Sequence, residues 1–185
     1  MLTKKIALIC GSIQKDSFSA KVLREVFTKY QNENVQLDYI DFNEYELPFF
    51  DGSNECREKA ARFAQKIDAS DGYIIISPEY HNSFSGVLKN AFDFLNGSQF
   101  KGKPVAIMST SGGGKGGINC LNAMRLFLRG LYAMVLPDQL VINKCDMIDE
   151  DTVSKVFKLV DDTVDFLEFR AYQEKSSLKI LQDTK

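Results

Sequence analysis

The sequence lacks the features that would place the protein in a membrane or on a nucleic acid. No uninterrupted apolar run approaches the roughly 18 to 20 residues of a membrane-spanning helix. The 23 basic and 25 acidic residues are mixed along the chain, without a long block of one sign, and the net charge is −2. Composition therefore gives no support for binding to nucleic acid or to an anionic membrane.

Cysteine is sparse, and its spacing excludes further kinds of site. No two cysteines form a C-x-x-C motif, so neither a zinc site nor dithiol chemistry is supported. Small, semi-buried thiols of this kind are typical of a protein in a reducing compartment. The apolar run Ile6–Cys10 is too short for a signal peptide and predicts a first strand, so we expect a cytoplasmic protein. The four cysteines are Cys10, Cys56, Cys120 and Cys145.

Common nucleotide and phosphoryl motifs are missing where they would be needed. The loop after the first strand has no G-x-G-x-x-G, which makes a Rossmann dinucleotide site a weak hypothesis. The run Gly112–Gly117 is not a Walker A loop, since Lys115 is followed by glycine rather than Ser or Thr. A response-regulator receiver needs an acidic cluster at the end of the first strand, where this chain has Cys10-Gly11-Ser12.

The chain does contain a regular alternation of strand-like and helix-like segments. Apolar runs of strand length are each followed by apolar residues at helical spacing, and the fifth run contains Pro137, which predicts an edge or bulged strand. The expected strands are Lys4–Cys10, Val35–Asp41, Gly72–Ser77, Pro104–Thr110 and Val135–Asn143. The expected helices begin after Ser17, span about Asn54–Ser70, begin near Ser83 or Ser85, follow Gly117, and span about Asp151–Tyr172.

This alternation predicts a single α/β domain. With 185 residues and 44% hydrophobic content, the chain suits a flavodoxin-like three-layer sandwich with a five-stranded parallel sheet in the order 2-1-3-4-5. We expect the domain to occupy residues 1–173 and residues 174–185 to form a frayed C-terminal tail.

A polar loop follows the first expected strand and has the composition of a phosphate site. Hydroxyls at Ser12, Ser17 and Ser19, the Gln14 amide and the N–H groups of a helix start together form an anion site that needs no metal. The same residues would serve an ordinary capped helix, and the pattern does not separate the two.

Two further loops follow the third and fourth expected strands, which are neighbours of the first in this order. The three loops should therefore meet in one pocket. In the second loop, Tyr80 and His81, the only histidine, are also consistent with exposed surface residues, and Glu79 has no partner that the sequence identifies. The run Gly112–Gly117 would allow close approach of the backbone to a flat ligand, or is a flexible turn.

These motifs together resemble the NADPH-dependent FMN reductase family over about residues 4 to 140. The resemblance rests on Gly11-Ser12-x-x-x-x-Ser17-x-Ser19, Ser77-Pro78-Glu79-Tyr80, the segment Leu88–Asp93 and the glycine run Gly112–Gly117. Within the family, PEYH, SGVLKNAFDFL and GGGKGGINCLNAMR are most similar to bacterial FMN-dependent NADPH azoreductases, also called azobenzene reductases.

The resemblance implies FMN as cofactor and NADPH as hydride donor. The FMN phosphate would bind the first loop, the isoalloxazine ring the second, and its pyrimidine side the third. Gln14 stands where the family often has Arg, so a charge-assisted phosphate contact is replaced by a neutral amide, and His81 stands where many members have Asn. The implied cofactor-binding residues are Ser12, Gln14, Ser17, Phe18, Ser19, Pro78, Glu79, Tyr80, His81, Asn82, Ser111, Gly112, Gly113, Gly114 and Lys115.

The resemblance also implies a ping-pong reaction without a protein nucleophile or a metal. Nicotinamide passes hydride to flavin N5, and an azo compound, a quinone or a similar flat acceptor then takes two electrons in the same place. Water or, as a weaker alternative, His81 supplies protons. A separate hypothesis, based only on charge and position, is that Lys115 attracts the 2′-phosphate of NADPH. A flavodoxin-type electron carrier and an FMN-binding sensor, neither with nicotinamide turnover, remain as alternatives.

Family members that resemble this chain build the flavin pocket at subunit contacts, so a homodimer or homotetramer is expected. The expected interface residues, for which core packing is the alternative, are Phe92, Phe94, Leu126 and Phe127.

Overall fold

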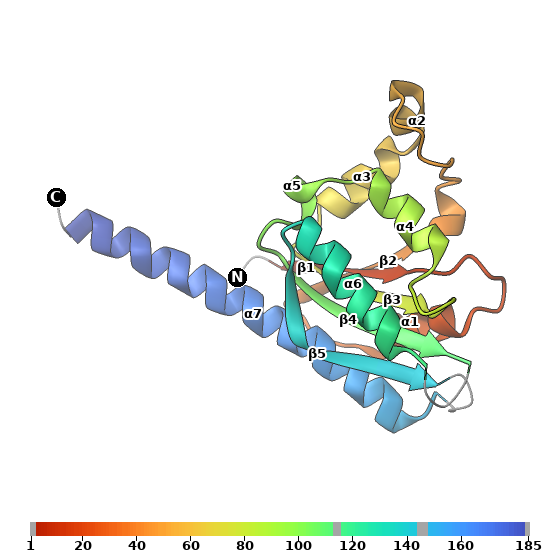
Figure 1. Ribbon diagram of the computed structural model, residues 1–185. Helices are drawn as coiled ribbons and strands as arrows, with labels where there is room; N and C mark the ends of the chain where they lie inside the picture. Colours follow the sequence, from red (N-terminus) through yellow and green to blue (C-terminus); the bar gives the residue numbers. More distant parts are fainter. Residues whose placement is uncertain (1–2, 113–115, 144–147, 184–185) are drawn as a thin grey trace.

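The computed structural model describes residues 3–112, 116–143 and 148–183, and describes side chains as far as residue 173. Five parallel strands form one sheet in the order β2-β1-β3-β4-β5 (Figure 1), so the predicted flavodoxin-like order is confirmed. The strands are β1 (Lys4–Cys10), β2 (Val35–Asp41), β3 (Gly72–Pro78), β4 (Pro104–Ser111) and β5 (Met134–Asn143). The helices are α1 (Phe18–Lys29), η1 (Phe42–Glu44), α2 (Asn54–Lys59), α3 (Ala61–Asp68), α4 (Gly86–Asp93), α5 (Gly97–Phe100), α6 (Ile118–Gly130) and α7 (Glu150–Asp183).

Helices cover both faces of the sheet because successive strand residues point to opposite sides. Ile6 and Leu8 of β1 pack in one apolar cluster with α1 and α7. Ala7 and Ile9 belong to a second cluster on the other face, with α3, α4 and α6. The central strands β3 and β4 are buried along nearly their whole length, which explains their unbroken apolar runs.

The edge strand β5 carries the irregularity that its proline predicts. Val105 of β4 pairs with Val135, but Ile107 pairs with Gln139, so the register shifts across the segment that contains Pro137. Proline has no N–H to donate to a neighbouring strand, and an edge strand with a bulge accommodates it.

The expected helix over Asn54–Ser70 is wrong in one respect, because it is divided at Ala60 into α2 and α3. The two parts pack in different places. Cys56 and Ala60 join Phe94 in a small separate cluster, whereas Phe63 belongs to the main core over the sheet. The apolar spacing is helical throughout and does not reveal this change of direction.

The last helix is longer than its expected span of Asp151–Tyr172. α7 continues to Asp183, through most of the segment 174–185 that was expected to fray, and its C-terminal part extends away from the sheet (Figure 1). The division into a domain over 1–173 and a tail stays a prediction. Among the described residues, no helix is both long and apolar enough to cross a membrane.

The amino-terminal end of the central strands is closed by polar groups that all bind within the chain. The Tyr73 hydroxyl lies 3.0 Å from the Ile67 carbonyl oxygen and 2.8 Å from that of Gln99. Lys103 donates from Nζ to the Ser70 carbonyl at 2.7 Å. Tyr73 is fully buried and Lys103 is half-buried, and this burial raises the pKa of Tyr73 and lowers the pKa of Lys103.

Candidate functional site

The first loop, Gly11–Ser17, joins β1 to α1 at the carboxyl end of the sheet. Ser17 is the N-cap of α1, and its Oγ accepts from the Ala20 N–H at 3.3 Å. The Oγ of Ser12 accepts from the Gln14 N–H at 3.3 Å. Two of the predicted hydroxyls therefore shape the loop and cap the helix, and each still has its own O–H to donate to a ligand.

The start of α1 also offers backbone donors. Within the described part of the chain, no acceptor is found for the N–H groups of Phe18 and Ser19. The first turn of α1 has no acidic residue, and the exposed residues Gln14, Lys15 and Asp16 precede its N-cap, so that the charges of Lys15 and Asp16 offset each other. Unpaired N–H groups at the positive end of a helix dipole suit a phosphate group.

Buried hydrogen bonds join the loops that follow β1, β3 and β4, so these loops meet as the strand order predicts. The hydroxyls of Ser19 and Thr110 lie 2.7 Å apart, the Ser85 hydroxyl donates to the Gly11 carbonyl, and the Glu79 N–H donates to the Thr110 carbonyl at 2.8 Å. Thr110 was not among the predicted site residues. Its position at the end of a buried strand is the only signal that could have identified it.

The second loop contains a two-residue hairpin turn over residues 80–83. Tyr80 and Ser83 exchange backbone hydrogen bonds of 2.9 and 3.0 Å, and His81 and Asn82 have φ values of 50° and 64°. This is a type I′ turn, in which Asn is favoured and His is tolerated. The turn leaves the Tyr80 side chain 50% exposed and the His81 side chain also exposed.

Glu79 is directed toward α6, a partner that the sequence did not indicate. Its Oε2 accepts from the Cys120 N–H at 3.0 Å. Asn82 makes a second link to the same helix, where its Oδ1 accepts from the Asn119 side chain at 3.1 Å. The second loop and the start of α6 are therefore held together.

The third loop, residues 111–117, is described at both of its ends. Ser111 is buried, and a Cβ added at Gly112 would meet none of the described residues within 4 Å, so with respect to them this backbone is open. The predicted site residues Gly113, Gly114 and Lys115 lie outside the described residues. At Gly116, an added Cβ would lie 2.1 Å from Ser111 Oγ, which makes glycine necessary there.

The cysteine thiols near these loops are buried and do not resemble nucleophiles. Burial raises the pKa of both Cys10 and Cys120, although weaker hydrogen bonds oppose the shift. A thiol with a raised pKa stays protonated at neutral pH and is unreactive. Cys120 donates weakly to the Ser77 carbonyl, and the buried Ser109 hydroxyl on β4 also lies near this thiol.

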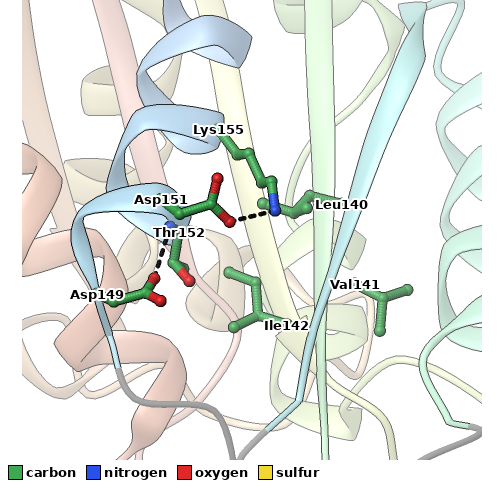
Figure 2. A pocket seen from close by; sticks show the side chains of 7 residues that line it. All are labelled: Leu140, Val141, Ile142, Asp149, Asp151, Thr152 and Lys155. Carbon is green, nitrogen blue, oxygen red and sulfur yellow. Dashed lines mark hydrogen bonds and ion pairs between the residues drawn. The ribbon is translucent and has the colours of Figure 1, made fainter.

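One hollow of the described surface lies beside this site rather than in it. It measures about 450 Å³ and is formed by the end of β5 and the start of α7. Figure 2 shows that Asp149 binds the Thr152 N–H and that Lys155 pairs with Asp151. Two carboxylates at a helix start that is already capped disfavour an anion, so this hollow does not suit a phosphate group.

A second, more apolar hollow of about 310 Å³ adjoins the first loop and the start of α4. Ile13 contributes from the first loop and Val87 from α4. Between them, the Asn90 side chain binds both the Pro48 carbonyl and the Phe50 N–H, and this holds the connecting segment in place. The Phe49 side chain is left 90% exposed at the rim.

Fold and site together define a flavodoxin-like protein with a phosphate-type loop beside a hairpin turn and a glycine loop. Comparison with known proteins gives the family, because residues 4–146 match the model for NADPH-dependent FMN reductases. The chain therefore belongs to the NADPH-dependent FMN reductase family, and it is an FMN-dependent oxidoreductase that uses NAD(P)H.

Individual relatives agree with this assignment. The chain is 38% identical over 149 residues to the NADPH azoreductase of Bacillus sp. (strain OY1-2). The matched segment covers 80% of this chain and 83% of that protein. It is 30% identical to the FMN-dependent NADPH-azoreductase of Staphylococcus aureus (strain USA300), over 75% and 77% of the two chains.

Solved structures show the same architecture. FerB from Paracoccus denitrificans, a flavoenzyme NAD(P)H:(acceptor) oxidoreductase, is similar with a TM-score of 0.71 and 26% identity, over 90% of this chain and 98% of that one. A flavodoxin from Archaea has a TM-score of 0.62 at 14% identity, over 89% and 99% of the two chains. The second likeness shows the fold alone, since electron carriers and reductases share it.

The described residues fit FMN. The N–H groups of Phe18 and Ser19 and the hydroxyls of Ser12 and Ser17 are donors of the kind that a phosphate requires. The open backbone at Gly112 leaves room for a flat ring. The individual ring contacts of Pro78, Glu79, Tyr80, His81 and Asn82 stay a prediction.

Proposed function

We propose that the protein uses NADPH to reduce azo compounds, quinones and similar flat acceptors. The proposal is supported by the names of its relatives, which include two azoreductases, and by its membership of the NADPH-dependent FMN reductase family. The bound flavin supplies the two-electron chemistry, and the chain supplies binding and orientation.

The main support for the proposal is that three loops meet beside backbone N–H groups for which the described residues provide no acceptor. The first loop binds the phosphate through the N–H groups of Phe18 and Ser19, and Gln14 adds a neutral donor at its mouth. The ring lies between the hairpin turn and the glycine loop, and the hydrogen bond from the Glu79 N–H to the Thr110 carbonyl joins the two segments where they begin. The apolar hollow beside Ile13 and Val87 gives a flat aromatic acceptor a surface to contact.

The test is to mix the purified protein with FMN, NADPH and an azo dye. Without oxygen, and beyond the one NADPH that reduces each FMN, NADPH should be consumed only when the dye is present, with two NADPH used for each azo bond cleaved to amines, because that cleavage takes four electrons. A quinone should consume one NADPH. A protein that neither retains FMN nor oxidises NADPH would contradict the proposal.

A flavodoxin-type electron carrier is the second candidate, and the likeness to an archaeal flavodoxin favours it at the level of fold. A carrier would retain FMN but would consume NADPH only after a separate reductase is added. The same assay without and with such a reductase separates the two functions.

We further propose that Lys115 selects NADPH over NADH through attraction to the 2′-phosphate. The basis is its charge and its place in the glycine run. Lys115→Ala should reduce the preference for NADPH, and an unchanged preference would contradict this role.

The oligomeric state and the cellular location of the protein are also proposals. We propose a homodimer or homotetramer in the cytoplasm. Of the expected interface residues, Phe92 and Phe94 are buried in the core, so their proposed exposure is wrong, whereas Leu126 is 71% exposed on α6. Tyr132 and Met134 are exposed nearby in sequence. Sedimentation of the wild type and of Leu126→Glu tests whether this face mediates assembly.

A further inference from the structure

Helix α6 begins without a capping side chain of its own. Its N-cap is Gly117, which has a φ of 100° and makes no side-chain hydrogen bond. A Cβ at this position would lie 2.6 Å from Val141 Cγ1. The Ser, Thr, Asn or Asp that usually caps a helix therefore has no room at residue 117, and the first N–H groups of α6 need an acceptor from elsewhere in the fold.

Glu79 supplies that acceptor from another loop. Cys120 is the third residue of α6, and its N–H is one that an N-cap side chain commonly binds. Here the Cys120 N–H donates to Glu79 Oε2 at 3.0 Å. The carboxylate also lies at the positive end of the helix dipole, where a negative charge is favoured.

The same carboxylate also lies close to Gly116, which immediately precedes the N-cap of α6. Glu79 Oε1 lies 3.2 Å from the position that a Cβ of Gly116 would occupy. The backbone of Glu79 is anchored to the end of β4 through its hydrogen bond to the Thr110 carbonyl, 2.8 Å long. The bond between Asn119 and Asn82 joins the helix to the hairpin turn at a second point.

We propose that Glu79 is a positioning residue, whose carboxylate replaces the missing N-cap of α6 and thereby holds the start of this helix beside the hairpin turn in the geometry that binds FMN. The inference rests on the proposed function. In this role the Glu79 carboxylate acts on FMN through the start of α6. Without it, FMN would have to order these segments when it binds, and affinity would fall.

Two variants of Glu79 and one matched control test this role. Glu79→Ala removes the acceptor, and Glu79→Gln keeps an oxygen acceptor without the charge. Ser53→Ala is the control, because Ser53 Oγ caps the corresponding third N–H of α2, that of Cys56, at 3.1 Å. α2 does not carry any of the three loops, so Ser53→Ala loses an equivalent cap away from the site.

We expect Glu79→Ala to raise the Kd for FMN about tenfold, Glu79→Gln to stay within about threefold of the wild type, and Ser53→Ala to leave the Kd unchanged. Rescue by glutamine separates positioning from a charge effect on the flavin. The proposal is overturned if Glu79→Ala binds FMN as tightly as the wild type, or if Glu79→Gln binds as weakly as Glu79→Ala.

Hydrogen exchange on the FMN-free wild type gives a second test, which holds even if Glu79→Ala does not fold. The Cys120 amide should exchange more slowly than the amides of Ile118 and Asn119, because it alone of the three has the Glu79 acceptor. Equal exchange rates would overturn the role. Failure of the proposed function is recognised separately, since the wild type itself would then bind no FMN.

Discussion

At the amino-terminal end of the sheet, the Tyr73 hydroxyl and the Lys103 ammonium group bind backbone carbonyls of their own chain. At the carboxyl-terminal end, the N–H groups of Phe18 and Ser19 find no acceptor among the described residues. Both ends hold polar groups beside a buried apolar core. The two ends of the sheet differ in whether these polar groups already have hydrogen-bond partners. A ligand gains most binding free energy from donors that folding has left unpaired.

The comparison also separates two roles within the carboxyl-terminal end. Ser19, Thr110 and Glu79 use their side chains or backbone to connect the loops. These connecting groups resemble the polar groups at the amino-terminal, closed end of the sheet, because their hydrogen-bond partners also belong to the chain. Mutations at the closed end should therefore affect stability alone, mutations of exposed side chains beside the unpaired N–H groups should affect ligand affinity alone, and mutations of the connecting residues should affect both.

The largest expected effect is at the closed end, on Phe100. This side chain is fully buried, with ring centroids 4.7 Å from Tyr73 and 5.2 Å from Phe92. Phe100→Ala should lower the free energy of unfolding by about 3 to 5 kcal/mol in urea titrations. The control Phe49→Ala removes a ring that is 90% exposed and should change it by less than about 0.5 kcal/mol.

The folded fraction of Phe100→Ala should bind FMN within about twofold of the wild type, because the two ends are independent sites. A large loss of affinity in the folded fraction would show that the ends are coupled.

A smaller effect, on affinity rather than stability, is expected at Gln14. Gln14→Glu places a negative charge at the mouth of the phosphate loop and should raise the Kd for FMN about tenfold, whereas Gln14→Arg should lower it. Both changes should weaken with added salt. Gln36→Glu, on the exposed edge strand β2, is the matched control and should leave the Kd unchanged. Fluorescence titration of FMN measures all of these values, and equal affinities for the Glu and Arg variants would place the phosphate elsewhere.

The hairpin turn should show an effect of about the same size on stability. His81 has a φ of 50°, which a β-branched residue adopts at a cost of about 1 to 2 kcal/mol. His81→Val should therefore lower the free energy of unfolding by about that amount, and His81→Asn should stay within about 0.5 kcal/mol of the wild type. If both variants were equally stable, the turn would have another conformation in solution.

The smallest effect is expected at alkaline pH, from Tyr30 away from both ends. Burial, together with its hydrogen bond to Asp161, raises the pKa of Tyr30 to about 12. The unfolded chain loses this proton near pH 10, so the stabilisation is complete below about pH 10 and is lost as the pH rises toward 12. Urea unfolding should show a slightly steeper loss of stability over this range in the wild type than in Tyr30→Phe. Parallel curves for the two proteins would contradict the shift.

The fold was readily predictable because its main signal is local. β1 and β2 have the expected bounds, and the other strands differ by one residue at an end, since strands buried on both faces need continuous apolar runs. The division of α2 from α3 at Ala60 was not predictable, because the apolar spacing stays helical while the packing partners change. Phe92 and Phe94 were placed on the surface for a similar reason, since periodicity does not say how many neighbours a helix has.

In the candidate site, too, the features that depend on neighbouring residues were predictable and the contacts between distant residues were not. Ser17 as a helix cap and the meeting of three loops follow from residue type and strand order, because capping depends on a few neighbouring residues and parallel strands end at the same edge. The Ser19–Thr110 bond and the Glu79–Cys120 bond join residues 91 and 41 positions apart.

Composition, spacing and motif thus suffice for the order of the sheet, the family and the place of the pocket, since these depend on patterns along the chain. Which polar groups are paired within the chain and which remain for a ligand depends on distances between segments that only the packed fold brings within hydrogen-bond range. Glu79 is the clearest case, because its partner exists only once Gly117 is packed against Val141 and leaves α6 without a cap of its own.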